Sequence, residues 1–140
     1  MISTWSSGKI RNGAEICPRV LVIDGEPLVR WSLVAGLRHA GFDAVSAGTR
    51  EDALALAREA PQPVVVLLDI GLWGVEAGEL LTAIRHGAPC CRVLLLAVEG
   101  QEVPPLDEVN VIRKPFDLHA VVARVRAALP YSRHDAKLAV

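Results

Sequence analysis

The chain has no long hydrophobic run and almost no excess of charge, and these absences limit what it can be. Hydrophobic residues make up 51% of its 140 residues, yet no apolar stretch approaches the roughly 18 residues that a membrane-spanning helix needs. A formal net charge of -1 gives no general attraction to nucleic acids or membrane surfaces. The composition therefore predicts one domain with a buried core and no direct binding to DNA or lipid.

Cysteine is scarce as well, with Cys17, Cys90 and Cys91 only. No C-x-x-C spacing occurs, and the odd number argues against a disulfide framework and a zinc site. We therefore expect a protein of the reducing cytoplasm. Residues 1–16 lack the apolar centre of a signal peptide and are expected to form a flexible extension. A folded domain is predicted at residues 17–130, followed by a tail at 131–140.

Short apolar runs alternate with helical patterns through the folded part. The runs predict strands at residues 19–24, 43–47, 64–69, 92–97 and 109–113. The patterns between and after them predict helices at 27–40, after Thr49, at 75–86 and after Asp117. This alternation predicts an α/β fold with a doubly wound, five-stranded parallel sheet. A helix is expected to be shortened or missing at residues 98–108, because Gly100 and the Pro104-Pro105 pair disfavour it.

Two of the apolar strands end in an aspartate, Asp24 and Asp69. The carboxyl ends of strands line the ligand crevice in open α/β sheets, so both acids are predicted at one edge of the sheet. The alternative is that each acid only caps the helix that follows it.

Lys114 is predicted to join the two acids. Arginine is the usual basic residue of this chain, and the other lysines, Lys9 and Lys137, lie in the two end segments. An ammonium on a flexible stem suits a point charge that meets a phosphate or carboxylate in a tight pocket. The Lys114–Pro115 bond is a candidate for a cis peptide, which would fix the direction of the stem.

Three segments around these residues carry a family resemblance. Val-Leu-Val-Ile-Asp-Gly-Glu-Pro at 20–27, Leu-Leu-Asp-Ile at 67–70 and Arg-Lys-Pro-Phe at 113–116 resemble the signature segments of response-regulator receiver domains of two-component signalling. The likeness covers residues 19–129 and implies a flavodoxin-like fold. It also implies a sensor histidine kinase as partner and Mg²⁺ as cofactor. Asp69 would be the phosphoacceptor, Lys114 would pair with the phosphate, and Asp24, Asp69 and the backbone carbonyl of Gly71 would hold the metal.

The chain also departs from the family pattern. Gly25 stands where a second metal-binding acid is usual, and Glu26 is a doubtful substitute because its side chain is expected to point elsewhere. Ala97 replaces the hydroxyl residue that binds the phosphoryl group, and Val111 replaces the aromatic residue of the switch. Trp73 replaces a proline near the pocket mouth, where it is a candidate interface residue.

Three functions follow from these matches and departures. The favoured one is an atypical receiver, or pseudo-receiver, which signals by protein contact with weak or no phosphorylation. The second is a working, Mg²⁺-dependent phosphoacceptor. The third, a small flavodoxin-like enzyme or nucleotide binder, is disfavoured because no glycine-rich phosphate loop follows the first strand.

We predict no enzyme activity, a signalling-protein partner, and self-association, if any, through helix 27–40 and the last helix. Trp31 is expected to pack at the edge of helix 27–40, with an interface role as the alternative.

Overall fold

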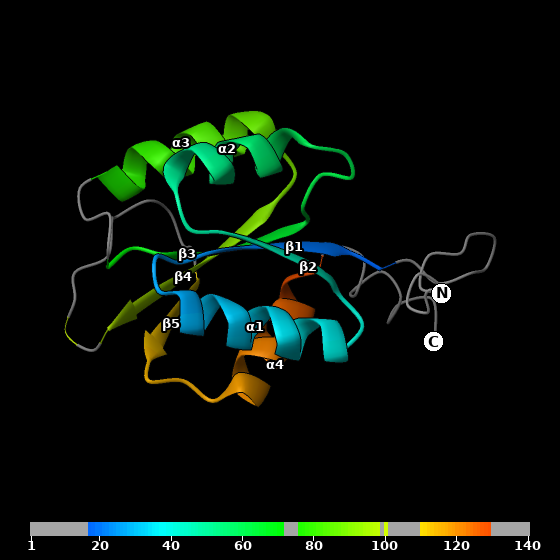
Figure 1. Cartoon of the computed structure of the whole chain (residues 1–140), viewed down its shortest axis with the longest axis vertical. Coiled ribbons are helices and arrows are strands. Elements are labelled where there is room, and N and C mark those ends of the chain that lie inside the picture. The colour runs from blue at the N-terminus through cyan, green and yellow to red at the C-terminus, as the bar shows by residue number, and fades with distance from the viewer. Residues whose placement is uncertain (1–16, 72–75, 99, 101–109, 130–140) are drawn as a thin grey trace.

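The computed structural model describes residues 17–71, 76–98, 100 and 110–129, and the structural statements below concern these residues. Five strands and four helices alternate along them (Figure 1). In chain order they are β1 (Arg19–Ile23), α1 (Pro27–His39), β2 (Asp43–Ala47), α2 (Arg50–Arg58), β3 (Val65–Asp69), α3 (Glu76–Gly87), β4 (Arg92–Val98), β5 (Asn110–Lys114) and α4 (Leu118–Ala128).

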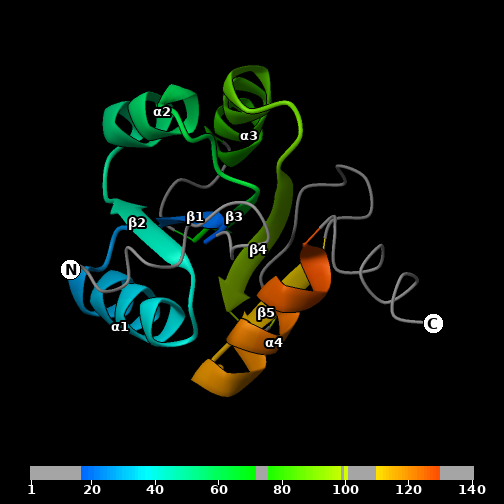
Figure 2. The ribbon, with the colours of Figure 1, turned by 90° about the vertical axis from the view of Figure 1, so that its right-hand side faces the viewer.

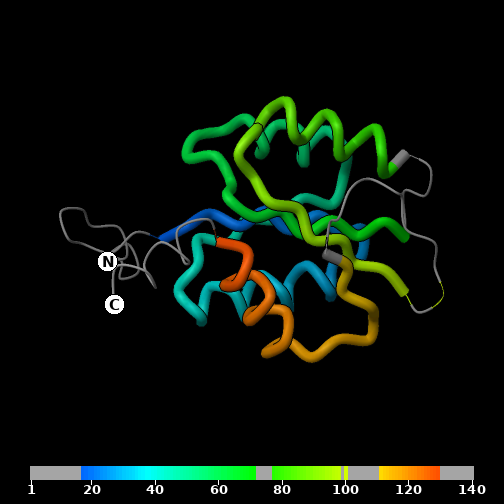
Figure 3. Tube along the Cα trace, turned by 180° about the vertical axis from the view of Figure 1, so that it is seen from behind, coloured from blue at the N-terminus to red at the C-terminus, as the bar shows by residue number. Residues whose placement is uncertain are grey.

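The five strands form one parallel sheet in the order β2-β1-β3-β4-β5. Helices α2 and α3 cover one face of the sheet, and α1 and α4 cover the other (Figures 1 and 2). The same two helical layers are seen from behind in Figure 3. This arrangement confirms the predicted flavodoxin-like fold. Ligand crevices in such folds lie at the carboxyl ends of the strands, where the chain order reverses between β1 and β3.

The helix ends follow the expected local chemistry. Pro27 occupies the first turn of α1, where its missing N–H leaves no helical hydrogen bond unmade. Gly41, with φ of 100°, lies just beyond that helix. Thr49 caps α2 by accepting a hydrogen bond from the Asp52 N–H, and Asp117 caps α4 by accepting one from the His119 N–H. These two hydrogen bonds order the loop between β2 and α2 and the loop between β5 and α4.

Apolar side chains pack on both faces of the sheet. Leu21 and Ile23 of β1 lie in the cluster beneath α2 and α3, whereas Val20 and Val22 lie in the cluster beneath α1 and α4. This alternation follows from the period of two along a strand. A sheet covered on both faces keeps its strands rigid, so the residues at the strand ends are held in fixed positions.

Some predicted features fall outside the described residues. The segment at residues 98–108, in which we expected a helix to be shortened or missing, is described only at Val98 and Gly100. Residues 1–16 and the tail at 131–140 also lie outside the described residues. Val98 is the last residue of β4, one residue beyond the predicted end of that strand. The Lys114–Pro115 bond is cis, as is the Ala60–Pro61 bond.

Candidate functional site

The ends of three strands bring one ammonium and two carboxylates together. Asp24 follows β1 and Asp69 ends β3, and the two strands are direct neighbours in which Ile23 pairs with Leu68. Lys114 ends β5, which is separated from β3 by β4. Its long side chain reaches across β4 to both acids.

Lys114 Nζ lies 3.2 Å from Asp24 Oδ2 and 3.5 Å from Asp69 Oδ2. Asp24 is fully buried and Asp69 is only 4% exposed. The second oxygen of each carboxylate accepts a hydrogen bond from the backbone. Asp24 Oδ1 accepts one from the Glu26 N–H and Asp69 Oδ1 accepts one from the Gly71 N–H, each at 2.9 Å. Each aspartate therefore uses one oxygen to order its own loop and turns the other toward Lys114. The alternative that each acid only caps the following helix does not describe Asp24, because Glu26 is the N-cap position of α1 and no side chain caps that helix.

Burial and charge shift the ionisation of two of these groups in definite directions. Burial raises the pKa of Asp69 above its usual value, and the charge of Asp24 adds to this, while the Gly71 N–H and Lys114 act in the opposite direction. Burial lowers the pKa of Lys114, but Asp24 and Asp69 outweigh it, so the pKa is raised overall. The ammonium is therefore held firmly in its charged form.

Arg30 supports the site, although no pattern in the sequence pointed to it. Its Nη1 donates a hydrogen bond of 2.8 Å to the backbone carbonyl of Asp24. The same guanidinium lies against Gly48, since a Cβ placed there would stand 2.8 Å from Arg30 Cζ and closer still to Nη1. Arg30 therefore links the loop after β1 to the loop after β2, and Gly48 leaves the space that it occupies.

Replacing Gly48 by alanine is expected to displace Arg30 and to lower the free energy of unfolding by about 1 kcal/mol, the worth of one hydrogen bond. Gly78→Ala in α3 is the matched control, because nothing lies within 4 Å of its added methyl group; it should stabilise the helix by up to about 1 kcal/mol. Urea unfolding measures both changes. In an Arg30→Met background, Gly48→Ala should cost nothing further, and an unchanged cost there would contradict the role of Arg30.

Of the positions that depart from the family pattern, the structure describes Gly25, Ala97 and Val111, with Glu26 beside Gly25. Glu26 is exposed and serves as the N-cap position of α1 without a side-chain cap bond, and Gly25 offers no side chain. Ala97 of β4 is fully buried, and Val111 of β5 packs against the same apolar cluster beneath α2 and α3. Neither residue can donate a hydrogen bond from its side chain. Trp73 lies outside the described residues.

Within the described residues, no group of three or more His, Cys, Asp or Glu side chains is arranged to hold a metal ion. Asp24 and Asp69 offer two carboxylates, and Lys114 faces one oxygen of each. Mg²⁺ prefers six oxygen ligands in near-octahedral geometry, usually one or two carboxylates with water and phosphate oxygens. The residues therefore fit Mg²⁺ poorly while the ammonium stays between the acids.

Comparisons with known proteins agree on the family. The chain is 34% identical over 117 residues to the transcriptional regulatory protein PrrA of Mycobacterium tuberculosis, covering 80% of this chain and 50% of PrrA. It is 36% identical over 118 residues to the DNA-binding response regulator MtrA of Mycolicibacterium smegmatis, covering 79% and 50%. The chain thus spans about half the length of these curated relatives. No protein-family model matches it.

Solved structures share the fold. A CheY-like response regulator receiver domain protein from Methanospirillum hungatei superposes with a TM-score of 0.71 at 22% identity, covering 84% of this chain and 98% of that one. A response regulator from Thermotoga maritima gives 0.69 at 24% identity, covering 81% and 98%. None of the described helices is long and apolar enough to cross a membrane. Taken together with the strand order and the acids at the strand ends, these likenesses identify the described residues as a response-regulator receiver domain of the CheY-like kind.

Proposed function

We propose that this is an atypical receiver domain, which signals through contact with a partner protein and is phosphorylated at Asp69 weakly or not at all. The observation that carries the proposal is the closed arrangement of Asp24, Asp69 and Lys114. Each carboxylate accepts a hydrogen bond from a backbone N–H with one oxygen and forms an ion pair with Lys114 Nζ through the other. The ammonium offsets the repulsion between two buried acids, so the group is stable without a metal or a phosphate.

The poor fit to Mg²⁺ supports this proposal. In a receiver, the metal would neutralise charge on the phosphoryl oxygens during transfer. Gly25 supplies no carboxylate, and Glu26 is exposed beside the fully buried Asp24. Without a third acid, the protein depends on Lys114 alone to balance the charge that a phosphoryl group would bring.

The positions that would pass on the signal also support it. A hydroxyl near the end of β4 would be needed to bind a phosphoryl oxygen, but Ala97 has none and is enclosed in the core. Val111 already packs against the same cluster as Ala97, so no large side chain stands there to change between two positions. A phosphate on Asp69 would therefore have little effect on the far side of the domain.

The second candidate, a working phosphoacceptor, is favoured by the 3.5 Å separation of Lys114 Nζ and Asp69 Oδ2. A sensor histidine kinase would then be the partner. An Asp69 oxygen would form a bond to phosphorus as the bond from phosphorus to the kinase histidine nitrogen breaks, and that nitrogen would keep the electron pair. Lys114 would pair with the new phosphate. The two candidates differ in whether this adduct forms.

Incubating the chain with acetyl phosphate and Mg²⁺ distinguishes them by intact mass. We expect little or no phosphoryl adduct on the wild type under conditions in which a Gly25→Asp/Ala97→Thr double variant, with both missing groups restored, is phosphorylated. Asp69→Asn in the double variant should abolish its adduct and so identify the modified residue. A wild type phosphorylated as fully as the double variant would establish the second candidate instead.

A further inference from the structure

Two adjacent cysteines, Cys90 and Cys91, lie in the turn that joins α3 to β4. The Cys91 N–H donates a hydrogen bond of 3.1 Å to the carbonyl of Ala88, which closes the turn. Because the turn precedes β4, it lies at the amino ends of the parallel strands, opposite the arrowheads in Figure 1. The candidate functional site lies at the carboxyl ends. The two thiols are therefore a separate chemical feature of the domain.

The two thiols differ in exposure. Cys90 is exposed, whereas Cys91 is half-buried and packs against the apolar cluster beneath α2 and α3. Burial raises the pKa of the Cys91 thiol, and the charge of Cys90 raises it further, while Arg85 acts in the opposite direction. Cys91 therefore keeps its proton at neutral pH, and its interaction with Cys90 places the two thiols close together. Cys90 is the thiol that a small oxidant in solution reaches first.

Cys17, the remaining cysteine of the chain, is too far away to take part. It lies two residues before β1, whereas Cys91 lies directly before β4. Strand β3 separates β1 from β4 in the sheet, and two strand spacings amount to about 9.6 Å. A disulfide joins residues whose Cα atoms are roughly 4–7 Å apart. Among the three cysteines, Cys90 and Cys91 are therefore the pair that can react within one molecule without a movement of the strands.

We propose that Cys90 and Cys91 form a peroxide-sensitive thiol pair, which a hydroperoxide converts into a reversible disulfide between the two neighbouring residues. The Cys90 thiolate attacks one oxygen of the hydroperoxide, so that an S–O bond forms and the O–O bond breaks. The other oxygen leaves with the electron pair and takes up a proton to give an alcohol or water. The Cys91 sulfur then gives up its proton and attacks the sulfenic acid of Cys90, so that an S–S bond forms and the S–O bond breaks with release of water. The two thiols lose two electrons in total, and one hydroperoxide is reduced.

The geometry of neighbouring residues makes this disulfide easy to reduce again. Consecutive Cα atoms are about 3.8 Å apart, which is closer than the usual separation in a disulfide and stores strain in the bond. Strained and exposed disulfides have the higher reduction potentials that are typical of labile, regulatory bonds. A small thiol reductant therefore reopens the bond and restores the starting state.

Formation of the disulfide changes the packing at this end of the sheet. The Cys91 sulfur moves away from the apolar cluster beneath α2 and α3 and toward its exposed neighbour. The backbone around the turn is tied to the segment before β3, because the Arg92 N–H donates to the Val64 carbonyl at 2.9 Å and Gln62 Nε2 donates to the Gly87 carbonyl at 2.7 Å. Oxidation is therefore expected to destabilise the amino ends of β3 and β4.

The test uses the full chain, first fully reduced and then treated with a small excess of hydrogen peroxide. The intact mass should fall by about 2 Da, the two hydrogens lost when a disulfide forms, and dithiothreitol should restore it. Cleavage after Arg85 and Arg92 releases residues 86–92 as one peptide, in which the bond can be located. The oxidised form should unfold at a lower urea concentration than the reduced form. Cys91 loses its packing, and so small a ring restricts the unfolded chain little.

Single variants assign the role of each thiol. Cys90→Ser should slow the consumption of peroxide at least about tenfold, because the thiol that faces the solvent is lost. Cys91→Ser should leave the first step intact but accumulate a sulfenic acid at Cys90, which dimedone traps. Cys17→Ser is the matched control and should form the disulfide at the rate of the wild type.

Three results would overturn the inference. They are a wild type that gains oxygen atoms without losing hydrogens, a covalent dimer as the main product, and a Cys17→Ser variant that no longer forms the disulfide. The first would leave Cys90 without a resolving partner, and the second would assign its reaction to a contact between two copies. The inference does not rest on the proposed function, because phosphorylation of Asp69 is measured separately and at the other end of the sheet.

Discussion

Replacing Lys114 by methionine is expected to lower the free energy of unfolding by about 3 kcal/mol at neutral pH, because it leaves two buried acids without their cation. Methionine keeps most of the length and apolar surface of the lysine stem, so the change removes chiefly the charge. Asp24 is fully buried, and Asp69 is nearly so. We place the effect at the low end of the range for broken buried pairs, since the Lys114 side chain keeps 18% exposure.

The pH dependence of this loss follows from the direction of the Lys114 shift. Asp24 and Asp69 outweigh burial and raise the pKa of Lys114 above its usual 10.5, so the folded state holds this proton more tightly than the unfolded state. The stabilisation is therefore fully present below pH 10.5 and is lost as the pH rises through the folded-state pKa. The difference between wild type and Lys114→Met should be constant from neutral pH to about pH 10 and shrink above it.

Adding Asp69→Asn to Lys114→Met provides the control for this prediction. If the loss comes from the uncompensated acids, neutralising one of them should recover a large part of it. Urea unfolding of the two single variants and the double variant measures the coupling between the residues. A Lys114→Met protein as stable as wild type at pH 7 would mean that the ammonium does not stabilise the acids.

The fold could be predicted closely from the sequence, because β1, β3 and β4 are buried apolar runs with clear ends. The strand predicted at 64–69 begins at Val65, and the one predicted at 109–113 runs from Asn110 to Lys114. Such one-residue differences arise because strand ends depend on pairing with the neighbouring strand. Asn110, for example, pairs with Leu94 of β4. Thr49 and Asp117 could be identified as caps from their side chains alone.

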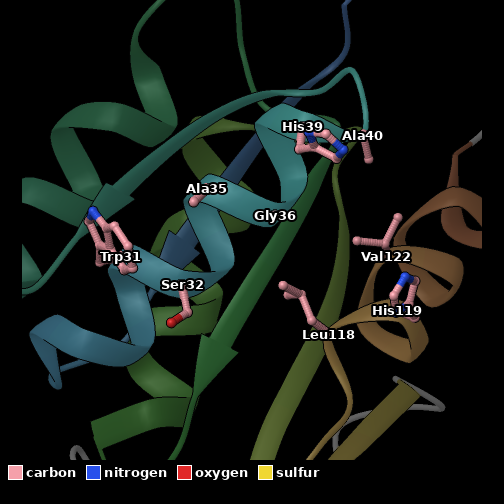
Figure 4. A pocket seen from close by; sticks show the side chains of 9 residues that line it. All are labelled: Trp31, Ser32, Ala35, Gly36, His39, Ala40, Leu118, His119 and Val122. Carbon is pink, nitrogen blue, oxygen red and sulfur yellow. The ribbon is translucent and has the colours of Figure 1, made fainter.

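The side-chain geometry around the site was less predictable. The sequence indicated that Asp24, Asp69 and Lys114 would lie near one another, since parallel strands place their carboxyl ends on one edge. Nothing in it indicated that Arg30 would bind the Asp24 carbonyl, because the reach of a long side chain depends on the angle between α1 and β1. The close approach of Gly36 to Leu118 depends likewise on how α1 and α4 pack (Figure 4). The expectation that Trp31 packs at the edge of α1 is wrong, since its side chain is 71% exposed.

Introducing aspartate at Gly25 is expected to tighten Mg²⁺ binding at least about tenfold, by adding a third carboxylate beside Asp24 and Asp69. A third acid also changes the balance around Lys114, which faces one oxygen of each aspartate at 3.2 and 3.5 Å. A divalent cation can then replace the ammonium between the carboxylates, because three negative charges exceed what one lysine offsets. Calorimetric titration of the wild type and the variant with Mg²⁺ measures the gain.

Gly25→Asn is the matched control for this change, since it adds a side chain of the same size without the charge. If the carboxylate itself is the missing ligand, Gly25→Asn should bind Mg²⁺ much more weakly than Gly25→Asp. A wild type that already binds Mg²⁺ as tightly as Gly25→Asp would show that Asp24 and Asp69 suffice. Lys114 would then have to leave its position between the two acids when the metal binds, and the closed arrangement would no longer argue against phosphorylation.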